Sequence, residues 1–224
     1  MNFIQDEDSQ QLQEMYRDFA EKEVKPIAKE IDESMRFPSE NIPKMAEMGL
    51  LGIPFPEEFG GAGMTTLSYI QCVEELSKVC ATTGVIVSAH TSLCATPIYT
   101  YGTDAQKEKY LKPLASGEQL GAFALTEPVA GTDASMQKST AVLEGDHYVL
   151  NGSKIFITNA GFADVYIVFA MTDKSKGTKG ISAFILEKDF PGFSVGTHEV
   201  KMGIRGSSTC ELFFDNCIVP KENL

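Results

Sequence analysis

Apolar residues in the first half of the chain recur at intervals of three and four positions, the period of an amphipathic helix. The spacing predicts a helix that includes residues 12–19 and is kinked or restarted at Pro26, and a short helix over residues 40–48. A further amphipathic helix is predicted to bury one stripe of side chains, namely Leu67, Ile70, Val73, Leu76 and Cys80. Residues 83–101 carry almost no charge, which predicts a helix buried on most sides.

After Gly117 the pattern changes to short segments rich in β-branched and aromatic residues, separated by turn signals such as Asn-Gly and Pro-Gly. These segments predict strands at residues 140–143, 148–150, 165–171, 181–186 and 212–219. No helical pattern separates them, which is typical of a small antiparallel β-barrel or sandwich. The sequence therefore predicts an α+β chain, with an all-helical domain at residues 1–117 and a β domain at residues 118–224.

Composition and charge narrow the class of ligand. The 224 residues are 43% hydrophobic and 22% charged, as in an ordinary globular protein, and the formal net charge is −12. The absence of a basic cluster argues against binding to nucleic acid or to an anionic membrane surface. We recognise no signal peptide and no apolar run long enough to cross a bilayer. An anionic ligand would have to be held by local dipoles, because the overall field does not attract it.

Cysteine and histidine spacing gives no metal motif. The five cysteines form no Cys-x-x-Cys pair, and we interpret them as reduced, buried thiols. His90, His147 and His198 lie far apart in the sequence, without the spacing of a zinc-binding helix. We therefore expect no metal site.

One stretch combines a strand with a polar turn. The run from Leu120 to Asp133 begins as an apolar strand and turns sharply at Pro128 and Gly131. The hydroxyls of Thr126 and Thr132 stand on either side of this turn. Such a loop can present free backbone N–H groups to a phosphate or carbonyl oxygen. An edge strand that ends in a polar turn gives the same pattern, so both interpretations remain open on the pattern alone.

Several motifs in a fixed order are more specific than this loop by itself. They are Pro56-Glu57-Glu58-Phe59-Gly60-Gly61, Phe123-Ala124-Leu125-Thr126-Glu127-Pro128, Leu150-Asn151-Gly152-Ser153-Lys154, Ile157-Thr158-Asn159, and Lys201-Met202-Gly203-Ile204-Arg205-Gly206-Ser207-Ser208. Together they resemble the acyl-CoA dehydrogenase family, and residues 123–135 (FALTEPVAGTDAS) look like its flavin-binding signature. The short-chain, butyryl-CoA-type members are the most similar, notably over residues 84–86, 179–184 and 203–208.

The resemblance implies a three-domain architecture, of which residues 1–224 contain the N-terminal helical domain and the middle β domain. The family's C-terminal four-helix domain carries the catalytic glutamate and much of the contact to the FAD adenine. We therefore expect no catalytic residue in this chain and a base beyond Leu224. The implied reaction is α,β-desaturation of an acyl-CoA thioester, with hydride transfer to the flavin.

The resemblance also assigns ligand-binding residues. Thr126 matches the residue whose hydroxyl reaches the flavin pyrimidine edge, where negative charge gathers on reduction. Thr158 matches a residue near flavin N5, and Thr132 matches one near the ligand phosphates. The implied cofactor-binding set is Phe123, Ala124, Leu125, Thr126, Gly131, Thr132, Phe156, Ile157 and Thr158. Thr132, Val85 and Ser88 are the implied substrate-binding residues. The chain has no Gly-x-Gly-x-x-Gly motif, so a Rossmann fold is not expected.

Two positions depart from the family pattern. Phe156 stands where many members have a tryptophan over the flavin, which retains an aromatic cover but loses the indole N–H. Met136 stands where a small residue is usual, which puts the packing at the end of the loop in question.

Three groups of charged residues allow two interpretations each. We interpret Glu127 as a loop and flavin-contact carboxylate rather than the base, because Pro128 fixes it beside the turn. Lys174, Lys176 and Lys179 form either a solvated hairpin tip, which we favour, or a contact to CoA phosphate. Arg205 is either structural or functional.

These observations lead to the hypothesis of an FAD-dependent short-chain acyl-CoA dehydrogenase that passes electrons to an electron-transfer flavoprotein. The resemblance implies a homotetramer for the full-length protein, in the cytoplasm or, in a eukaryote, the mitochondrial matrix. Two alternatives remain: an enoyl-CoA or aryl-acryloyl-CoA reductase of the same family, and a non-catalytic acyl-CoA-binding or assembly protein on this fold.

Overall fold

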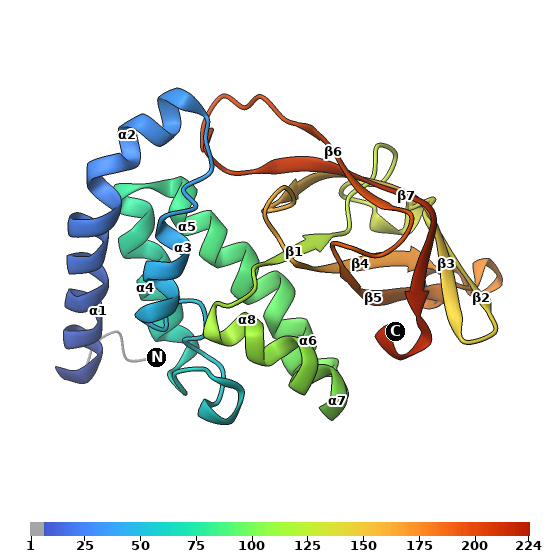
Figure 1. Ribbon diagram of the computed structural model, residues 1–224, viewed down its shortest axis with the longest axis horizontal. Helices are drawn as coiled ribbons and strands as arrows, with labels where there is room; N and C mark the ends of the chain where they lie inside the picture. Colours follow the sequence, from blue (N-terminus) through green and yellow to red (C-terminus); the bar gives the residue numbers. More distant parts are fainter. Residues whose placement is uncertain (1–6) are drawn as a thin grey trace. The chain divides into compact units, whose positions relative to one another are not determined.

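A computed structural model describes residues 7–224 of the chain (Figure 1). These residues form two compact units, which we describe separately. Unit 1 comprises residues up to Glu118 together with Val200–Ser207, and unit 2 comprises Gln119–Glu199 and Ser208–Leu224. The order of a helical part followed by a β part agrees with the sequence prediction.

Among residues 7–224, unit 1 contains eight α-helices: α1 (Glu7–Phe19), α2 (Lys25–Ser34), α3 (Asn41–Glu47), α4 (Thr66–Val79), α5 (Ala81–Ser88), α6 (Thr96–Tyr101), α7 (Asp104–Gln106) and α8 (Lys112–Ser116). Three π-helical segments lie between them, η1 (Ala20–Val24), η3 (Ala89–Ala95) and η4 (Lys107–Leu111). None of the helices within residues 7–224 is long and apolar enough to span a bilayer.

Each π-helical segment precedes a proline in the first turn of the next α-helix, at Pro26, Pro97 and Pro113. Proline lacks an N–H, and its ring clashes with the carbonyl of the preceding turn, so that turn widens and continues the helix at an offset. The predicted restart at Pro26 therefore has a defined form, a single π turn between α1 and α2.

The core of unit 1 joins α1, α3 and α4, and it corrects the predicted face of α4. Leu67 and Ile70 are more than half exposed, whereas Ser68, Gln71 and Glu75 are buried. These polar side chains become buried because α1 supplies partners for two of them. Tyr16 Oη lies 2.7 Å from Ser68 Oγ, and Arg17 Nε donates to Glu75 at 3.2 Å.

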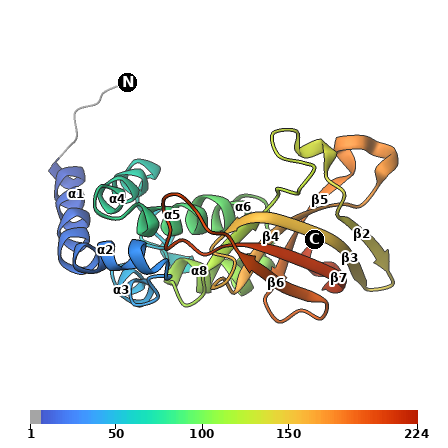
Figure 2. The same cartoon turned by 90° about the horizontal axis from the view of Figure 1, so that it is seen from above.

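Unit 2 is a seven-stranded sheet that curls around its own apolar face. Its strands are β1 (Gly121–Ala124), β2 (Thr140–Glu144), β3 (His147–Thr158), β4 (Val165–Met171), β5 (Ile181–Glu187), β6 (Phe193–His198) and β7 (Thr209–Pro220). Along the sheet they follow the order β1-β4-β2-β3-β7-β6, and β5 pairs with β4. Figure 2 shows β3 and β7 running side by side along much of their length.

The sheet is mixed, whereas the sequence predicted an antiparallel one. β1 pairs in parallel with β4, and β2 joins β4 through one parallel bridge. Parallel neighbours need a long crossover connection. Residues 125–164, which contain β2 and β3, provide it between β1 and β4. The predicted limits of β4 are confirmed, and β6, which sequence reasoning missed, pairs with β7.

β3 extends from His147 to Thr158, far beyond the predicted residues 148–150, because Asn151-Gly152 forms a bulge instead of a turn. Gly152 has φ +143°, and a Cβ there would lie 2.3 Å from Ser139 Oγ. Only glycine allows this close approach between β3 and the residue before β2. The chain therefore continues through Asn151-Gly152 and brings Lys154 into the sheet.

Candidate functional site

The loop at residues 125–139 leaves β1 and returns to β2, and its first turn is closed at both ends. The backbone N–H of Glu127 donates to the Ala130 carbonyl, and the Ala130 N–H donates to the Glu127 carbonyl, both at 3.0 Å. Pro128 sits inside this turn, where its fixed φ is favourable. The Thr126 carbonyl accepts the Ile155 N–H at 2.9 Å, so the start of the loop lies beside β3.

A buried ion pair holds the two ends of this loop together. Lys154 is fully buried and Glu127 is 3% exposed; Lys154 Nζ lies 2.8 Å from Glu127 Oε1. The same ammonium donates to the Leu125 carbonyl at 3.0 Å and to Gln137 Oε1 at 3.3 Å. Lys154 therefore contacts the entry of the loop, its first turn and its exit.

The Glu127 carboxylate completes this network by accepting the backbone N–H groups of Lys138 and Ser139. Burial by itself raises the pKa of Glu127, but these N–H donors and Lys154 outweigh it, and the pKa lies below its ordinary value. Burial lowers the pKa of Lys154, and Glu127 opposes this effect. Sequence reasoning gave Lys154 no role. The sequence feature that could have pointed to Lys154 is an ionisable residue in a strand whose neighbouring core-facing residues are apolar.

The exposed tip of the loop presents free hydrogen-bond donors. Among the described residues, the backbone N–H groups of Gly131, Thr132, Asp133 and Ala134 have no hydrogen-bond partner. Thr132 is exposed, and a Cβ added at Gly131 would meet no atom within 4 Å. Asp133 Oδ1 accepts the Ser135 N–H at 3.0 Å and caps the short helix at Ala134–Met136. A run of such N–H groups in an open turn is suited to an anion.

Phe156 lies on β3 with a backbone conformation that residues other than glycine rarely adopt. Its φ is +60°, the residue falls at the second bulge of β3, between Lys154 and Ile157, and it is 58% exposed. A non-glycine residue at positive φ stores strain, which persists only where the surroundings impose it. Through this bulge Ile157 returns to the core, while Thr158 remains half-buried. The result is an exposed aromatic ring between the loop entry and Thr158.

All nine predicted cofactor-binding residues lie in unit 2. Phe123 packs edge-to-face on Phe169, with 5.3 Å between the ring centroids, and Ala124 is buried in the core. Each of them can therefore contribute only backbone groups or apolar surface to a ligand site. Leu125 and Thr126 are half-buried beside β3, as described above. Thr126 and Thr158 therefore lie on neighbouring segments. Their joint action on one ligand remains a prediction.

The two remaining substrate-binding predictions lie in unit 1. Val85 and Ser88 are half-buried on α5. The Ser88 carbonyl accepts Ser92 Oγ at 2.6 Å and Tyr69 Oη at 3.3 Å. The substrate role of both residues remains a prediction.

Other charged candidates have structural partners. Lys174, Lys176 and Lys179 are exposed on the β4–β5 connection, and Lys176 pairs with Asp173 at 3.2 Å, as in a solvated tip. Met136 is half exposed, so the short helix there accommodates its bulk. The Arg205 backbone N–H donates to Asp32 Oδ1 at 3.1 Å, which gives that position a structural contact.

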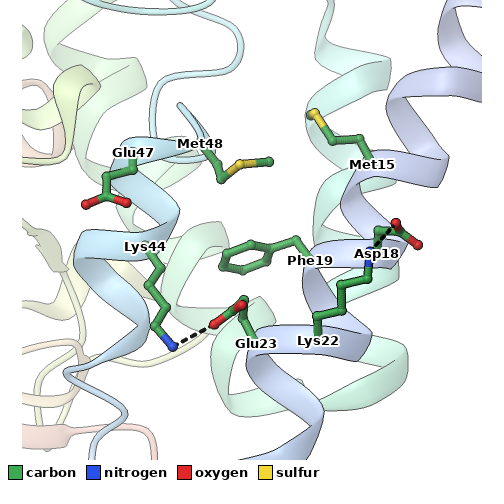
Figure 3. A pocket seen from close by; sticks show the side chains of 8 residues that line it. All are labelled: Met15, Asp18, Phe19, Lys22, Glu23, Lys44, Glu47 and Met48. Atoms are coloured by element: carbon green, nitrogen blue, oxygen red, sulfur yellow. Dashed lines mark hydrogen bonds and ion pairs between the residues drawn. The ribbon is translucent and has the colours of Figure 1, made fainter.

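Unit 1 also has a surface groove of about 680 Å³ between α1 and α3 (Figure 3). The Phe19 side chain points toward α3. The Lys44–Glu23 ion pair joins the two sides of the groove, and the Lys22–Asp18 ion pair lies along the α1 side, each at 2.7 Å. None of the predicted ligand-binding residues lines it. Within residues 7–224, no group of three or more potential metal ligands comes together, and none of the five buried cysteines forms a disulfide.

Comparisons with known proteins agree with this architecture. Residues 6–118 match the acyl-CoA dehydrogenase N-terminal domain, and residues 122–217 match the middle domain of that family. A short-chain specific acyl-CoA dehydrogenase of Clostridium acetobutylicum is 63% identical over the whole chain, which covers 59% of that protein. An acryloyl-CoA reductase (NADH) of Anaerotignum propionicum is 50% identical, and the chain covers 57% of it.

Among solved structures, one described as the electron transferring flavoprotein of Acidaminococcus fermentans matches the whole chain with a TM-score of 0.98 and 59% identity. The chain covers 59% of that structure, so it spans less than two thirds of each of these relatives. The two family domains together account for nearly all of the sequence. The chain therefore belongs to the acyl-CoA dehydrogenase family.

Proposed function

We propose that residues 1–224 form the flavin-binding part of a short-chain acyl-CoA dehydrogenase, which converts an acyl-CoA thioester to the 2-enoyl-CoA. The observation that carries this proposal is the loop at residues 125–139. It is fixed to β3 by the Lys154 network and presents free backbone donors at its tip, with Phe156 exposed nearby.

The residues present fit FAD. Its pyrophosphate is anionic, and the net charge of −12 gives such a group no long-range attraction. The N–H groups of residues 131–134 would supply local donors, as backbone nests do in other phosphate sites. Phe156 offers an exposed aromatic face to a planar ring. FAD, when bound, would supply the hydride acceptor of the reaction.

Within this proposal Thr126 and Thr158 have distinct roles. The Thr126 hydroxyl would donate to the pyrimidine edge of the ring, and Thr158 would donate near N5. Donors at these positions favour the reduced, more electron-rich ring. Thr132 would hold the phosphates, and Val85 and Ser88 would form part of the acyl pocket wall.

Glu127 is unsuited to be the base that removes the α-proton. It is buried, it is paired with Lys154, and its pKa is below the ordinary value, so it is a weak proton acceptor. The resemblance to the family assigns the base to a glutamate outside residues 1–224, and we propose the same here.

The proposed partners follow from the same assignment. They are a short-chain acyl-CoA and an electron-transfer flavoprotein, and the neighbour described as the electron transferring flavoprotein of Acidaminococcus fermentans supports the latter. We also propose a homotetramer, in the cytoplasm or in the mitochondrial matrix of a eukaryote.

The direct test uses the polypeptide as its gene encodes it. Purified protein should show the flavin absorbance bands and form crotonyl-CoA from butyryl-CoA with a dye or flavoprotein acceptor. The variant Thr158→Val should retain FAD but lose about 10–100-fold in kcat, since it removes one donor to the developing charge. A polypeptide without a flavin band and without crotonyl-CoA formation would contradict the proposal.

A second candidate is the reverse reaction. The relative from Anaerotignum propionicum is named an acryloyl-CoA reductase, and the same residues can serve either direction. Enoyl-CoA reduction that greatly exceeds acyl-CoA oxidation would favour this candidate. If the polypeptide binds acyl-CoA and holds no flavin, it is instead a non-catalytic binding protein on this fold.

A further inference from the structure

The buried ammonium of Lys154 touches the peptide group that precedes Thr126. Lys154 Nζ donates to the Leu125 carbonyl at 3.0 Å. That carbonyl belongs to the same peptide unit as the Thr126 N–H. Among the described residues this N–H has no partner. Thr126 thus carries a free backbone donor on a peptide whose oxygen already accepts a charged hydrogen bond.

A charged donor at a carbonyl strengthens the N–H of the same peptide, because the two dipoles polarise in the same direction. The effect is large where water is excluded, and Lys154 is fully buried. β3 fixes this peptide further, since the Ile155 N–H donates to the Thr126 carbonyl at 2.9 Å. Two consecutive residues of β3 therefore set both the orientation and the polarity of the backbone at Thr126.

Glu127 makes the arrangement electrically neutral. Its carboxylate pairs with Lys154 at 2.8 Å and accepts two backbone N–H groups from the loop exit. A ligand beside Thr126 would therefore sense the hydrogen-bond chain from Lys154 through the peptide and only weakly a net positive charge.

We propose that Lys154 is a positioning residue that polarises the Leu125–Thr126 peptide, so that the Thr126 N–H binds the flavin pyrimidine edge more tightly in its reduced state. The inference rests on the proposed function, because it requires FAD beside Thr126. It goes beyond that function by giving a buried strand lysine control over the relative stability of the two redox states.

The alternative is that Lys154 merely holds the loop closed. The two roles differ in one measurable quantity, the affinity for reduced flavin relative to oxidised flavin. If Lys154 only holds the loop closed, its removal weakens the affinities for oxidised and reduced flavin equally. Loss of the polarised donor instead weakens binding of the reduced flavin more. The reduction potential of the bound flavin reports this ratio directly.

The test measures flavin affinity and reduction potential in the polypeptide as encoded, for wild type and for the charge-neutral pair E127Q/K154M. The affinity ratio should fall about tenfold, which lowers the two-electron potential by about 30 mV. E127Q alone keeps the ammonium on the Leu125 carbonyl and removes the neutralising carboxylate, so its affinity ratio should be equal to or above that of wild type. D164N/K188M removes an exposed ion pair of the same unit without a net charge change, and should leave the potential unchanged.

Two results would overturn the inference while leaving the proposed function intact. One is an unchanged potential in E127Q/K154M, with parallel loss of both affinities. The other is an E127Q potential that falls as far as that of the double variant, which would assign the effect to the carboxylate. If the double variant does not retain flavin, a fall in the E127Q potential below that of wild type still overturns the inference. A wild-type polypeptide that binds no flavin would reject both proposals.

Discussion

Two buried carboxylates, one in each unit, are stabilised in different ways. Glu127 pairs with Lys154, and both side chains are almost completely inaccessible. Glu75 on α4 is 2% exposed, but its partners Arg17 and Lys78 are 54% and 51% exposed. The pair in unit 2 is closed to water on both sides, whereas the cluster in unit 1 has a buried acid with solvated partners.

This comparison distinguishes the free-energy cost of removing two charges from water from the free energy that they gain by pairing. A fully buried pair loses the hydration of both charges and depends on near-complete hydrogen bonding. The Lys154 ammonium meets this need with three acceptors, and the Glu127 carboxylate with three donors. The Glu75 cluster leaves its cations hydrated, so it costs less to form and is weakened by salt.

The largest effect expected from this comparison is that of breaking the closed pair on one side. Lys154→Met should lower the free energy of unfolding by about 3–5 kcal/mol, since it leaves a buried carboxylate without its cation. E127Q/K154M should recover most of this loss, because no charge stays buried. Denaturant unfolding of both variants measures the difference. Equal stability of the single and double variants would mean that the carboxylate does not need Lys154.

His90 offers an intermediate case, a fully buried imidazole that lies against a backbone carbonyl group. Its Nε2 lies 3.1 Å from the Leu114 carbonyl oxygen, and burial lowers its pKa from 6.5 to about 4. Between these values the unfolded chain binds a proton that the folded chain does not. The stabilisation is therefore present above pH 6.5 and is lost as the pH falls to about 4.

This shift corresponds to about 3 kcal/mol, at 1.36 kcal/mol per unit of pKa. Unfolding free energies measured between pH 7.5 and pH 4 should therefore fall more steeply in wild type than in His90→Gln, which keeps a donor for the Leu114 carbonyl but does not titrate. Identical slopes in the two proteins would show that His90 is protonated in the fold.

The smallest effect should come from the half-solvated cluster. Glu75→Gln should cost about 1–2 kcal/mol at low salt, and the loss should shrink in 1 M NaCl because the partners are exposed. Burial raises the pKa of Glu75, but Arg17 and Lys78 bring it down to about 2. Its contribution is therefore complete above pH 4.5 and disappears as the pH falls through about 2. A salt-independent loss would place this cluster in the same class as Glu127–Lys154.

The helices and strands could be predicted from sequence to different degrees. The limits of β4 follow from a continuous apolar run that is buried on both faces. Thr103 and Gln106, three residues apart, form a capping box in which the side chain of each accepts the backbone N–H of the other. β6 was missed because its residues other than Phe193 are small, polar or exposed, and its pairing depends on β7. Local sequence patterns therefore predicted the helices and strands that are stabilised by their own side chains, and missed the strand that depends on a distant partner.

The sequence by itself determined the family, the succession of a helical and a β part, and the loop with its threonines, because these depend on local spacing and on motifs in a fixed order. Only the tertiary structure decided which residues become buried. Leu67 and Ile70 are exposed on α4, while Glu75 is buried there and Lys154 inside the sheet. The reason is that burial of a charge depends on partners far along the chain, such as Arg17 for Glu75 and the residues 125–137 for Lys154.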